Sequence, residues 1–204
     1  MLIKICGMRH AASIEAAVKA GADALGFVFA ESVRQVTARQ AALLASRIPQ
    51  RVLRVAVMRN PDVELWREVE TIFCPDVLQT DAADFDYLEV PPGIACWPVL
   101  REGSAGGLAA LPDTFVYEGQ ASGRGEAVDW ADAAGLARKG RMILAGGLTP
   151  ENVAEAIRIV TPYGVDVSSA VETSPGVKDS ALIERFIQAV RGTEDGAQDE
   201  TKSE

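Results

Sequence analysis

The sequence predicts an α/β fold in which eight parallel strands and their connections close into one barrel. Short runs rich in Val, Ile and Leu alternate with longer helical patterns along the body of the chain, which is the pattern of repeated strand–helix units. Eight such units in about 190 residues fit a small single-domain (β/α)8, or TIM, barrel. The alternative is an open doubly wound sheet, but that fold favours GxGxxG after its first strand, where this chain reads Cys6-Gly7-Met8-Arg9.

The predicted elements follow from these patterns in chain order. The strands are expected at residues 2–6, 24–29, 52–57, 76–80, 95–100, 114–118, 142–145 and 164–167. The helices are expected at residues 11–20, 37–47, 61–72, 130–139, 151–160 and 180–191.

Capping residues support the helix ends. Gly21 favours the left-handed conformation that ends a helix, and Thr37 with Gln40 has the spacing of a capping box. Asn60-Pro61 and Thr149-Pro150 each put a capping side chain before a proline, which is favoured as the first helical residue. Each of these helices therefore has a predicted start or end.

The fourth and fifth connections, 81–93 and 101–112, are poor helix formers. The first contains Pro91-Pro92, and the second contains Gly103, Gly106 and Gly107. We expect short or irregular turns at both places.

Composition supports one folded domain with an acidic tail. The 204 residues are 48% hydrophobic and 24% charged, which is ordinary for a globular protein and excludes a disordered or fibrous chain. We expect a catalytic barrel over residues 1–191. Residues 192–204 carry five acids against one lysine, and we expect a disordered tail there. The net charge of −9 argues against nucleic acid as a partner.

The cysteine and histidine counts limit the chemistry. Three cysteines without CxxC spacing, and His10 as the single histidine, support neither a disulfide framework nor a metal site. We therefore expect a cytoplasmic protein. No apolar run approaches the roughly 20 residues that cross a bilayer, so no membrane association is expected. The sequence is compatible with a monomer or a homodimer.

The first strand carries the strongest catalytic candidate. Alternation along a strand puts Lys4 and Cys6 on one face and Ile3 and Ile5 on the other. If the isoleucines pack under the helices, Lys4 and Cys6 point into the barrel and Cys6 stands at its mouth. A neighbouring cation lowers the pKa of a thiol and favours the thiolate, the form that acts as a base or nucleophile. The alternative role is a buried, inert cysteine.

Two loops at the ends of the seventh and eighth strands predict a phosphate site. Gly146-Gly147 precede a predicted helix, and Ser168-Ser169 follow the eighth strand. Glycine exposes backbone N–H groups to an anion, and a helix amino terminus favours negative charge. Barrel enzymes often bind phosphate at these two loops. We therefore expect a small phosphorylated molecule as the ligand, although Gly146-Gly147 alone would fit a tight turn.

Three charged residues complete the predicted site. Glu118 ends the sixth strand and can act as a general acid opposite a Cys6 base, the combination that an internal redox isomerisation needs. Arg34 follows the second strand and can bind a carboxylate in two-pronged geometry. Asp166 shares a strand face with Ser168, and Lys4 is its expected partner. A solvated rim position is the alternative for Glu118 and for Arg34.

From Leu2 to about Arg191 the chain resembles the phosphoribosylanthranilate isomerase family of tryptophan biosynthesis. The resemblance rests on Lys4-Ile5-Cys6-Gly7-Met8, on 21–29 (GADALGFVF) with Ser32 and Arg34, on Val128-Asp129-Trp130, on 144–153 (LAGGLTPENV), and on 164–169 (GVDVSS) with 175–179 (PGVKD).

The resemblance implies a (β/α)8 enzyme without metal or organic cofactor. Its reaction would be the Amadori rearrangement of N-(5-phosphoribosyl)anthranilate to the 1-deoxyribulose 5-phosphate. Cys6 matches the family's general base, Arg34 matches its anthranilate-side arginine, and the Gly146-Gly147 and Ser168-Ser169 loops match its phosphate clamp.

The chain departs from the family pattern at five positions. Glu118 stands where the family usually has the aspartate that acts as general acid, and Asp81 stands where it usually has a histidine. The other departures are Val33, Arg124 and Ala170. A non-catalytic phosphosugar-binding barrel and another sugar-phosphate isomerase or epimerase are the alternatives. A metal-dependent epimerase would need more histidines than this chain has.

Overall fold

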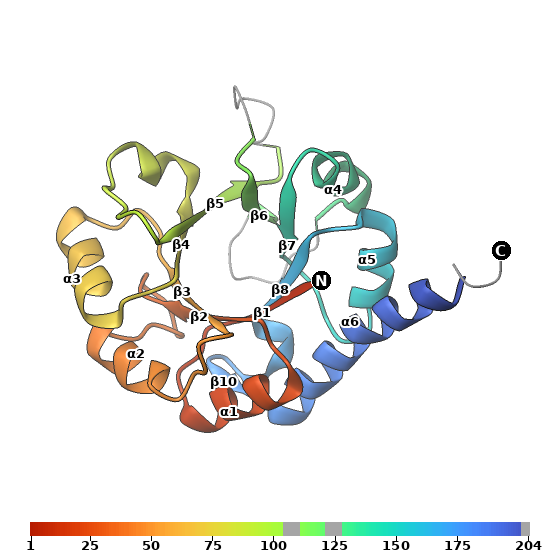
Figure 1. The fold of residues 1–204 in the computed structure, drawn as a ribbon, viewed down its shortest axis with the longest axis horizontal. Coiled ribbons are helices and arrows are strands. Elements are labelled where there is room, and N and C mark those ends of the chain that lie inside the picture. The colour runs from red at the N-terminus through yellow and green to blue at the C-terminus, as the bar shows by residue number, and fades with distance from the viewer. Residues whose placement is uncertain (104–110, 121–127, 201–204) are drawn as a thin grey trace.

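The computed structural model describes residues 1–103, 111–120 and 128–200, and its strands form a closed parallel barrel in the order β1 to β8. The barrel closes where β1 pairs with β8. Figure 1 shows the helices arranged around the strands. The predicted barrel is confirmed. The strands are β1 (Leu2–Cys6), β2 (Ala24–Val28), β3 (Leu53–Val57), β4 (Val77–Asp81), β5 (Ala95–Arg101), β6 (Thr114–Glu118), β7 (Arg141–Leu144) and β8 (Gly164–Val167).

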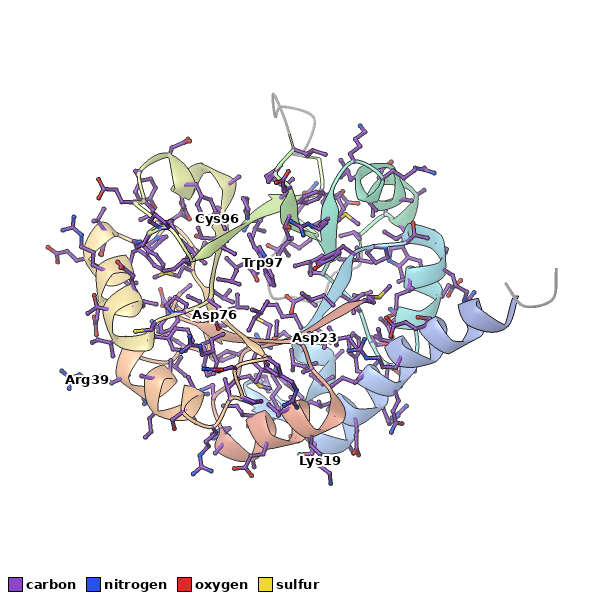
Figure 2. The ribbon with its side chains drawn as sticks, in the orientation of Figure 1. Lys19, Asp23, Arg39, Asp76, Cys96 and Trp97 are labelled. Atoms are coloured by element: carbon purple, nitrogen blue, oxygen red, sulfur yellow. The ribbon has the colours of Figure 1, made fainter. Side chains whose placement is uncertain are left out.

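Amphipathic helices cover the outside of the barrel. In Figure 2 the exposed side chains of Lys19 and Arg39 point away from the strands, whereas buried Trp97 lies near the centre. The α-helices of the described chain are α1 (Ala11–Ala20), α2 (Ala38–Ala45), α3 (Val63–Phe73), α4 (Trp130–Ala137), α5 (Val153–Val160) and α6 (Ser180–Glu200). No helix in the described ranges is both long enough and apolar enough to cross a membrane.

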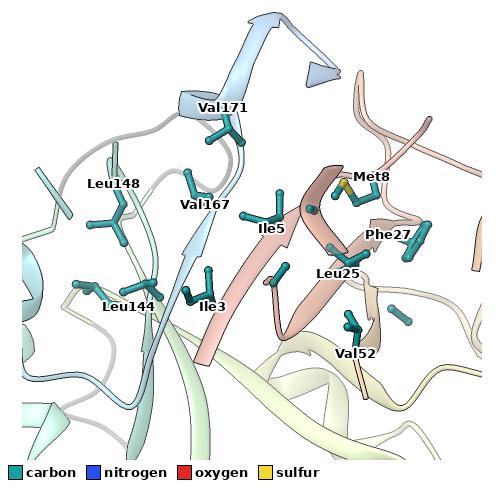
Figure 3. Close-up of a cluster of buried hydrophobic side chains, with 14 of the residues drawn as sticks. Ile3, Ile5, Met8, Leu25, Phe27, Val52, Leu144, Leu148, Val167 and Val171 are labelled. Carbon is teal, nitrogen blue, oxygen red and sulfur yellow. The ribbon is translucent and has the colours of Figure 1, made fainter. Parts of the chain in front are cut away.

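The predicted alternation of the first strand is confirmed. Ile3 and Ile5 belong to the hydrophobic layer between strands and helices, part of which Figure 3 shows. Lys4 and Cys6 take the opposite, inward face of the same strand. A second, smaller apolar cluster contains one or two side chains from most of the strands and fills the barrel interior. Its buried members are Ala24, Val55, Val77, Trp97, Val99, Val116, Ile143 and Ala145.

Of the four predicted caps, two are confirmed and two differ. Gly21 ends α1 in the left-handed conformation, and Thr37 forms a capping box with Gln40 at the start of α2. Asp62, not Asn60, caps α3, and its Oδ1 accepts the N–H of Leu65. Asn60 has a positive φ of 43° in place of the extended backbone of a cap, and its backbone N–H donates to Asp84. Helix α3 therefore begins two residues later than expected. Helix α5 begins at Val153 with Asn152 at its N-cap position, although Thr149 Oγ1 accepts the N–H of Glu151 and the N–H of Asn152 just before it.

The structure describes all of the fourth connection, which was expected to be irregular, and part of the fifth. After β4 the chain makes a 3-10 turn, Ala82–Asp86, in place of a full helix. Residues 104–110 of the fifth connection lie outside the described residues. The sequence patterns also missed a small antiparallel hairpin, β9 (Glu172–Ser174) with β10 (Val177–Lys178), between β8 and α6.

The last helix runs beyond the expected domain boundary at residue 191. Helix α6 continues to Glu200, nine residues past the boundary expected at residue 191. Arg191 donates to Asp23 and to Glu194, and Glu194 also binds the Met1 ammonium group. These contacts tie the helix to the opposite end of the chain. Residues 201–204 lie outside the described residues, and the division at 191 stays a prediction.

Two glycines give a stability test with opposite expected signs. A Cβ at Gly164 in β8 would lie 2.8 Å from the Leu2 carbonyl oxygen, whereas a Cβ at Gly135 in α4 would meet nothing within 4 Å. Gly164→Ala should lower the free energy of unfolding by about 1–3 kcal/mol, because two paired strands must separate. Gly135→Ala should raise it by about 0.5–1 kcal/mol, because alanine restricts the unfolded chain. Urea unfolding followed by circular dichroism measures both, and equal effects would contradict the prediction.

Candidate active site

One cavity of about 340 Å³ opens at the carboxyl ends of the strands and contains most of the predicted site. Parallel strands place the residues that follow them around one mouth, so positions far apart in the sequence meet there. Lys4 is the one predicted site residue that does not line this cavity. The predicted residues that line it are Cys6, Arg34, Glu118, Gly146, Gly147, Asp166, Ser168 and Ser169.

Lys4 lies inside the barrel as a fully buried cation. Its Nζ donates to Asp166 Oδ2 over 2.9 Å, and the two residues are register partners across the β1–β8 seam. The expected Lys4–Asp166 pair is thus confirmed. Burial on its own would lower the pKa of Lys4, but the Asp166 carboxylate and Cys6 raise it above its ordinary value. Lys4 therefore stays charged and acts from within the wall, since its side chain does not reach the cavity.

Two opposing influences act on the pKa of the Cys6 thiol: the burial of the side chain and the positive charge of Lys4. Burial raises the pKa of the Cys6 thiol, while the positive charge of Lys4 opposes that rise. The space for the thiol comes from Gly26 on the neighbouring strand. A Cβ at Gly26 would lie 2.9 Å from Cys6 Sγ and 3.2 Å from Lys4 Cε. Any larger residue there would displace the thiol or the lysine.

The two carboxylate oxygens of Asp166 have different surroundings. Oδ2 accepts from Lys4, and the buried Oδ1 has no hydrogen-bond partner among the residues that the structure describes. Because Asp166 also lines the cavity, a hydroxyl donor on a ligand can satisfy Oδ1.

Arg34 reaches the cavity edge in a fixed orientation. Its Nε and Nη2 donate to the two oxygens of Glu172 over 2.7 and 2.8 Å. Lys178 Nζ donates to the same carboxylate over 2.7 Å. Burial alone would raise the pKa of Glu172, but the hydrogen bonds from Arg34 and Lys178 outweigh it and lower the pKa to about 2. Glu172 and Lys178 were not among the predicted site residues.

A second charged group lies on the other side of the barrel mouth. Arg101, at the end of β5, contacts Asp81 at 2.6 Å and Glu118 at 3.4 Å. Asp81 thus takes the closer contact with the guanidinium. Sequence reasoning missed Arg101, although its place at a strand end was a usable signal. Arg124 lies outside the described residues.

The two predicted phosphate loops have the required backbone. Gly146 and Gly147 adopt positive φ angles of 88° and 64°, which favour glycine. Ser168 Oγ donates to the Cys6 carbonyl over 3.1 Å, so its hydroxyl links the loop to β1. Ala170 lies in a 3-10 turn, Ser169–Val171, and is not among the residues with positive φ. Replacing the family's glycine with Ala170 therefore causes no backbone strain.

This architecture defines a class of protein before any comparison is made. A closed parallel barrel with a thiol, carboxylates and two glycine- or serine-containing loops at its strand ends is a (β/α)8-barrel enzyme. Within the described residues, no three His, Cys, Asp or Glu side chains gather in a way that could hold a metal ion.

The comparisons identify the family. The family model described as N-(5'-phosphoribosyl)anthranilate (PRA) isomerase matches residues 3–189, and the chain belongs to this family of isomerases. An N-(5'-phosphoribosyl)anthranilate isomerase of Streptococcus pneumoniae is 41% identical over 93% of this chain and 95% of its own length. One from Rhodopseudomonas palustris is 37% identical over 96% and 98%.

Solved structures agree with this assignment. TrpF from Jonesia denitrificans superposes with a TM-score of 0.80 at 33% identity, covering 95% of this chain and 98% of its own. A phosphoribosyl anthranilate isomerase in complex with reduced 1-(o-carboxyphenylamino)-1-deoxyribulose 5-phosphate gives a TM-score of 0.75 at 28% identity, covering 94% and 99%.

The influence of Lys4 on Cys6 is measurable by alkylation. The charge-balanced variant Lys4→Met/Asp166→Asn removes both the cation that lowers the pKa of Cys6 and the carboxylate that raises it. Because Lys4 has the larger effect of the two, the midpoint pH for alkylation should rise. Iodoacetamide labelling across a pH series, followed by mass spectrometry of the Cys6 peptide, measures this. Exposed Cys74 and Cys96 serve as internal controls. An unchanged Cys6 midpoint would contradict the prediction, because it would mean that Lys4 lowers the pKa of the thiol no more than Asp166 raises it.

Proposed function

We propose that this chain converts N-(5'-phosphoribosyl)anthranilate into 1-(2-carboxyphenylamino)-1-deoxyribulose 5-phosphate, an Amadori rearrangement in tryptophan biosynthesis. The observation that carries the proposal is that Cys6 and Glu118 line the same cavity as Arg34 and the two phosphate loops. A base, an acid and binding groups for both ends of the substrate thus meet in one site. The cytoplasmic location predicted from the cysteine pattern belongs to the same proposal.

The proposed reaction begins at the ring oxygen of the ribose. Glu118 in its protonated form donates to that oxygen as the C1–O bond breaks, and the nitrogen lone pair forms a C1=N iminium. The Cys6 thiolate then removes the proton on C2, and the electron pair moves to give an enol with a C1=C2 double bond. A proton added at C1 and one lost from the C2 hydroxyl give the ketone. Atoms and electrons balance within the substrate, so the rearrangement needs no external oxidant.

The binding groups are proposed to divide between the two ends of the substrate. The backbone N–H groups near Gly146-Gly147 and Ser168-Ser169 bind the phosphate, as expected for loops of this conformation. Arg34 binds the anthranilate carboxylate. Asp166 Oδ1 accepts from a ribose hydroxyl, since it is a buried acceptor without a partner among the described residues and Asp166 lines the cavity. The predicted binding role of Lys4 becomes an indirect one through Cys6 and Asp166.

The assignment of base and acid is tested by turnover. Cys6→Ala and Glu118→Gln should each lower kcat by about 100-fold or more, because each removes one proton-transfer group. Freshly generated substrate and the loss of anthranilate fluorescence provide the assay. Glu15→Gln, in an exposed ion pair on α1, is the matched control.

The outcomes separate the alternatives. An inactive parent that still binds a phosphosugar would favour a non-catalytic barrel. A Glu118→Gln variant with parental kcat would assign the acid to another group, and a Cys6→Ala variant with parental kcat would refute the base.

A further inference from the structure

Glu172 is a buried carboxylate beside the site that the proposed reaction does not use. It begins the hairpin after β8, and only 4% of its side chain is exposed. Its Oε1 accepts from Arg34 Nε and Lys178 Nζ, and its Oε2 accepts from Arg34 Nη2 and the Gly176 N–H. Four donors from three residues therefore converge on one carboxylate.

The geometry of the guanidinium shows what this contact leaves available. Arginine presents five N–H donors in a rigid plane. Glu172 occupies the edge formed by Nε and Nη2, which leaves the edge formed by Nη1 and Nη2 for a second carboxylate. Arg34 lines the cavity, whereas Glu172 and Lys178 do not. Glu172 thus lies behind Arg34 as seen from the ligand space.

The close approach of Gly7 to the Arg34 side chain restricts the same orientation. A Cβ at Gly7 would lie 2.6 Å from Arg34 Cδ and 3.3 Å from Ser168 Oγ. The aliphatic stem of Arg34 therefore passes directly over the residue that follows Cys6. Gly7 therefore restricts the aliphatic part of the Arg34 side chain, and Glu172 restricts its guanidinium.

Lys178 connects this arrangement to the phosphate side of the cavity. Its Nζ donates to the Ser168 carbonyl oxygen over 2.9 Å as well as to Glu172. The cluster of Arg34, Glu172 and Lys178 holds two cations and one carboxylate, so it carries one net positive charge. A substrate carboxylate bound at Arg34 would neutralise that charge.

We propose that Glu172 is a positioning residue that holds the guanidinium of Arg34 so that its free edge selects a carboxylate on the aromatic ring of the substrate. The inference rests on the proposed function, in which Arg34 binds that carboxylate. Glu172 itself does not touch the substrate and acts through Arg34.

Two ligands that differ by one group test the role. The first is reduced 1-(o-carboxyphenylamino)-1-deoxyribulose 5-phosphate, and the second is the same compound without the ring carboxylate. Glu172→Gln should weaken binding of the first by about 10- to 100-fold, because the arginine loses its charged partner and its fixed orientation. Binding of the second should stay near the parental value. Isothermal titration measures both, and turnover should show a raised KM with a smaller change in kcat.

Companion variants separate positioning from folding. Glu172→Gln/Lys178→Met removes one charge of each sign and should lose the same preference for the carboxylated ligand. In an Arg34→Met background, Glu172→Gln should cause no further loss for that ligand, since the two residues act as one unit. Glu15→Gln is again the exposed control, and circular dichroism checks the fold of each variant.

The outcomes distinguish this inference from the proposed function. Equal weakening of both ligands would assign Glu172 a structural role, and unchanged binding of the carboxylated ligand would assign it no role at Arg34. Either result overturns the inference. A parent protein that binds both ligands but shows no turnover would instead overturn the proposed function. The comparison of the two ligands would still test the positioning role of Glu172.

Discussion

A buried charge at the seam of the barrel organises the whole molecule. A lysine can remain ionised in a barrel interior only if an opposite charge reaches it, because an unpaired buried cation is strongly unfavourable. The partner of Lys4 is 162 residues away, and closure of the β1–β8 seam brings it to 2.9 Å. The pairing that completes the barrel therefore also satisfies Lys4 and places Cys6 and Asp166 at one mouth.

The charges around the mouth fall into two groups with different origins. Strands β1, β2 and β8, with the hairpin that follows, contribute a cation-rich side built on Arg34, Lys178 and Glu172. Strands β4, β5 and β6 contribute Asp81, Arg101 and Glu118. The first group fits the binding and orientation of an anionic substrate, and the second contains the proposed acid. Arg101 thus lies between two carboxylates of the second group.

The sequence was informative wherever a local pattern determines the structure. The inward face of β1 follows from alternation, and the caps at Gly21 and Thr37 follow from contacts within one turn. The failure at Asn60 has a tertiary cause, because Asp84 binds its N–H. Glu172 was missed for a similar reason. Its partner Arg34 is 138 residues away, and a glutamate before a turn is locally indistinguishable from a solvated one.

The Lys4–Asp166 pair also bears on how the chain folds. Lys4 belongs to the first barrel strand and is synthesised before Asp166 in the eighth, and domains generally fold as units as the chain emerges. Any assembly of the first few strands must leave the lysine in water or bury it unpaired. Partial barrels are thereby disfavoured relative to the complete one. A lysine buried beside the proposed base thus also makes folding more nearly all-or-none.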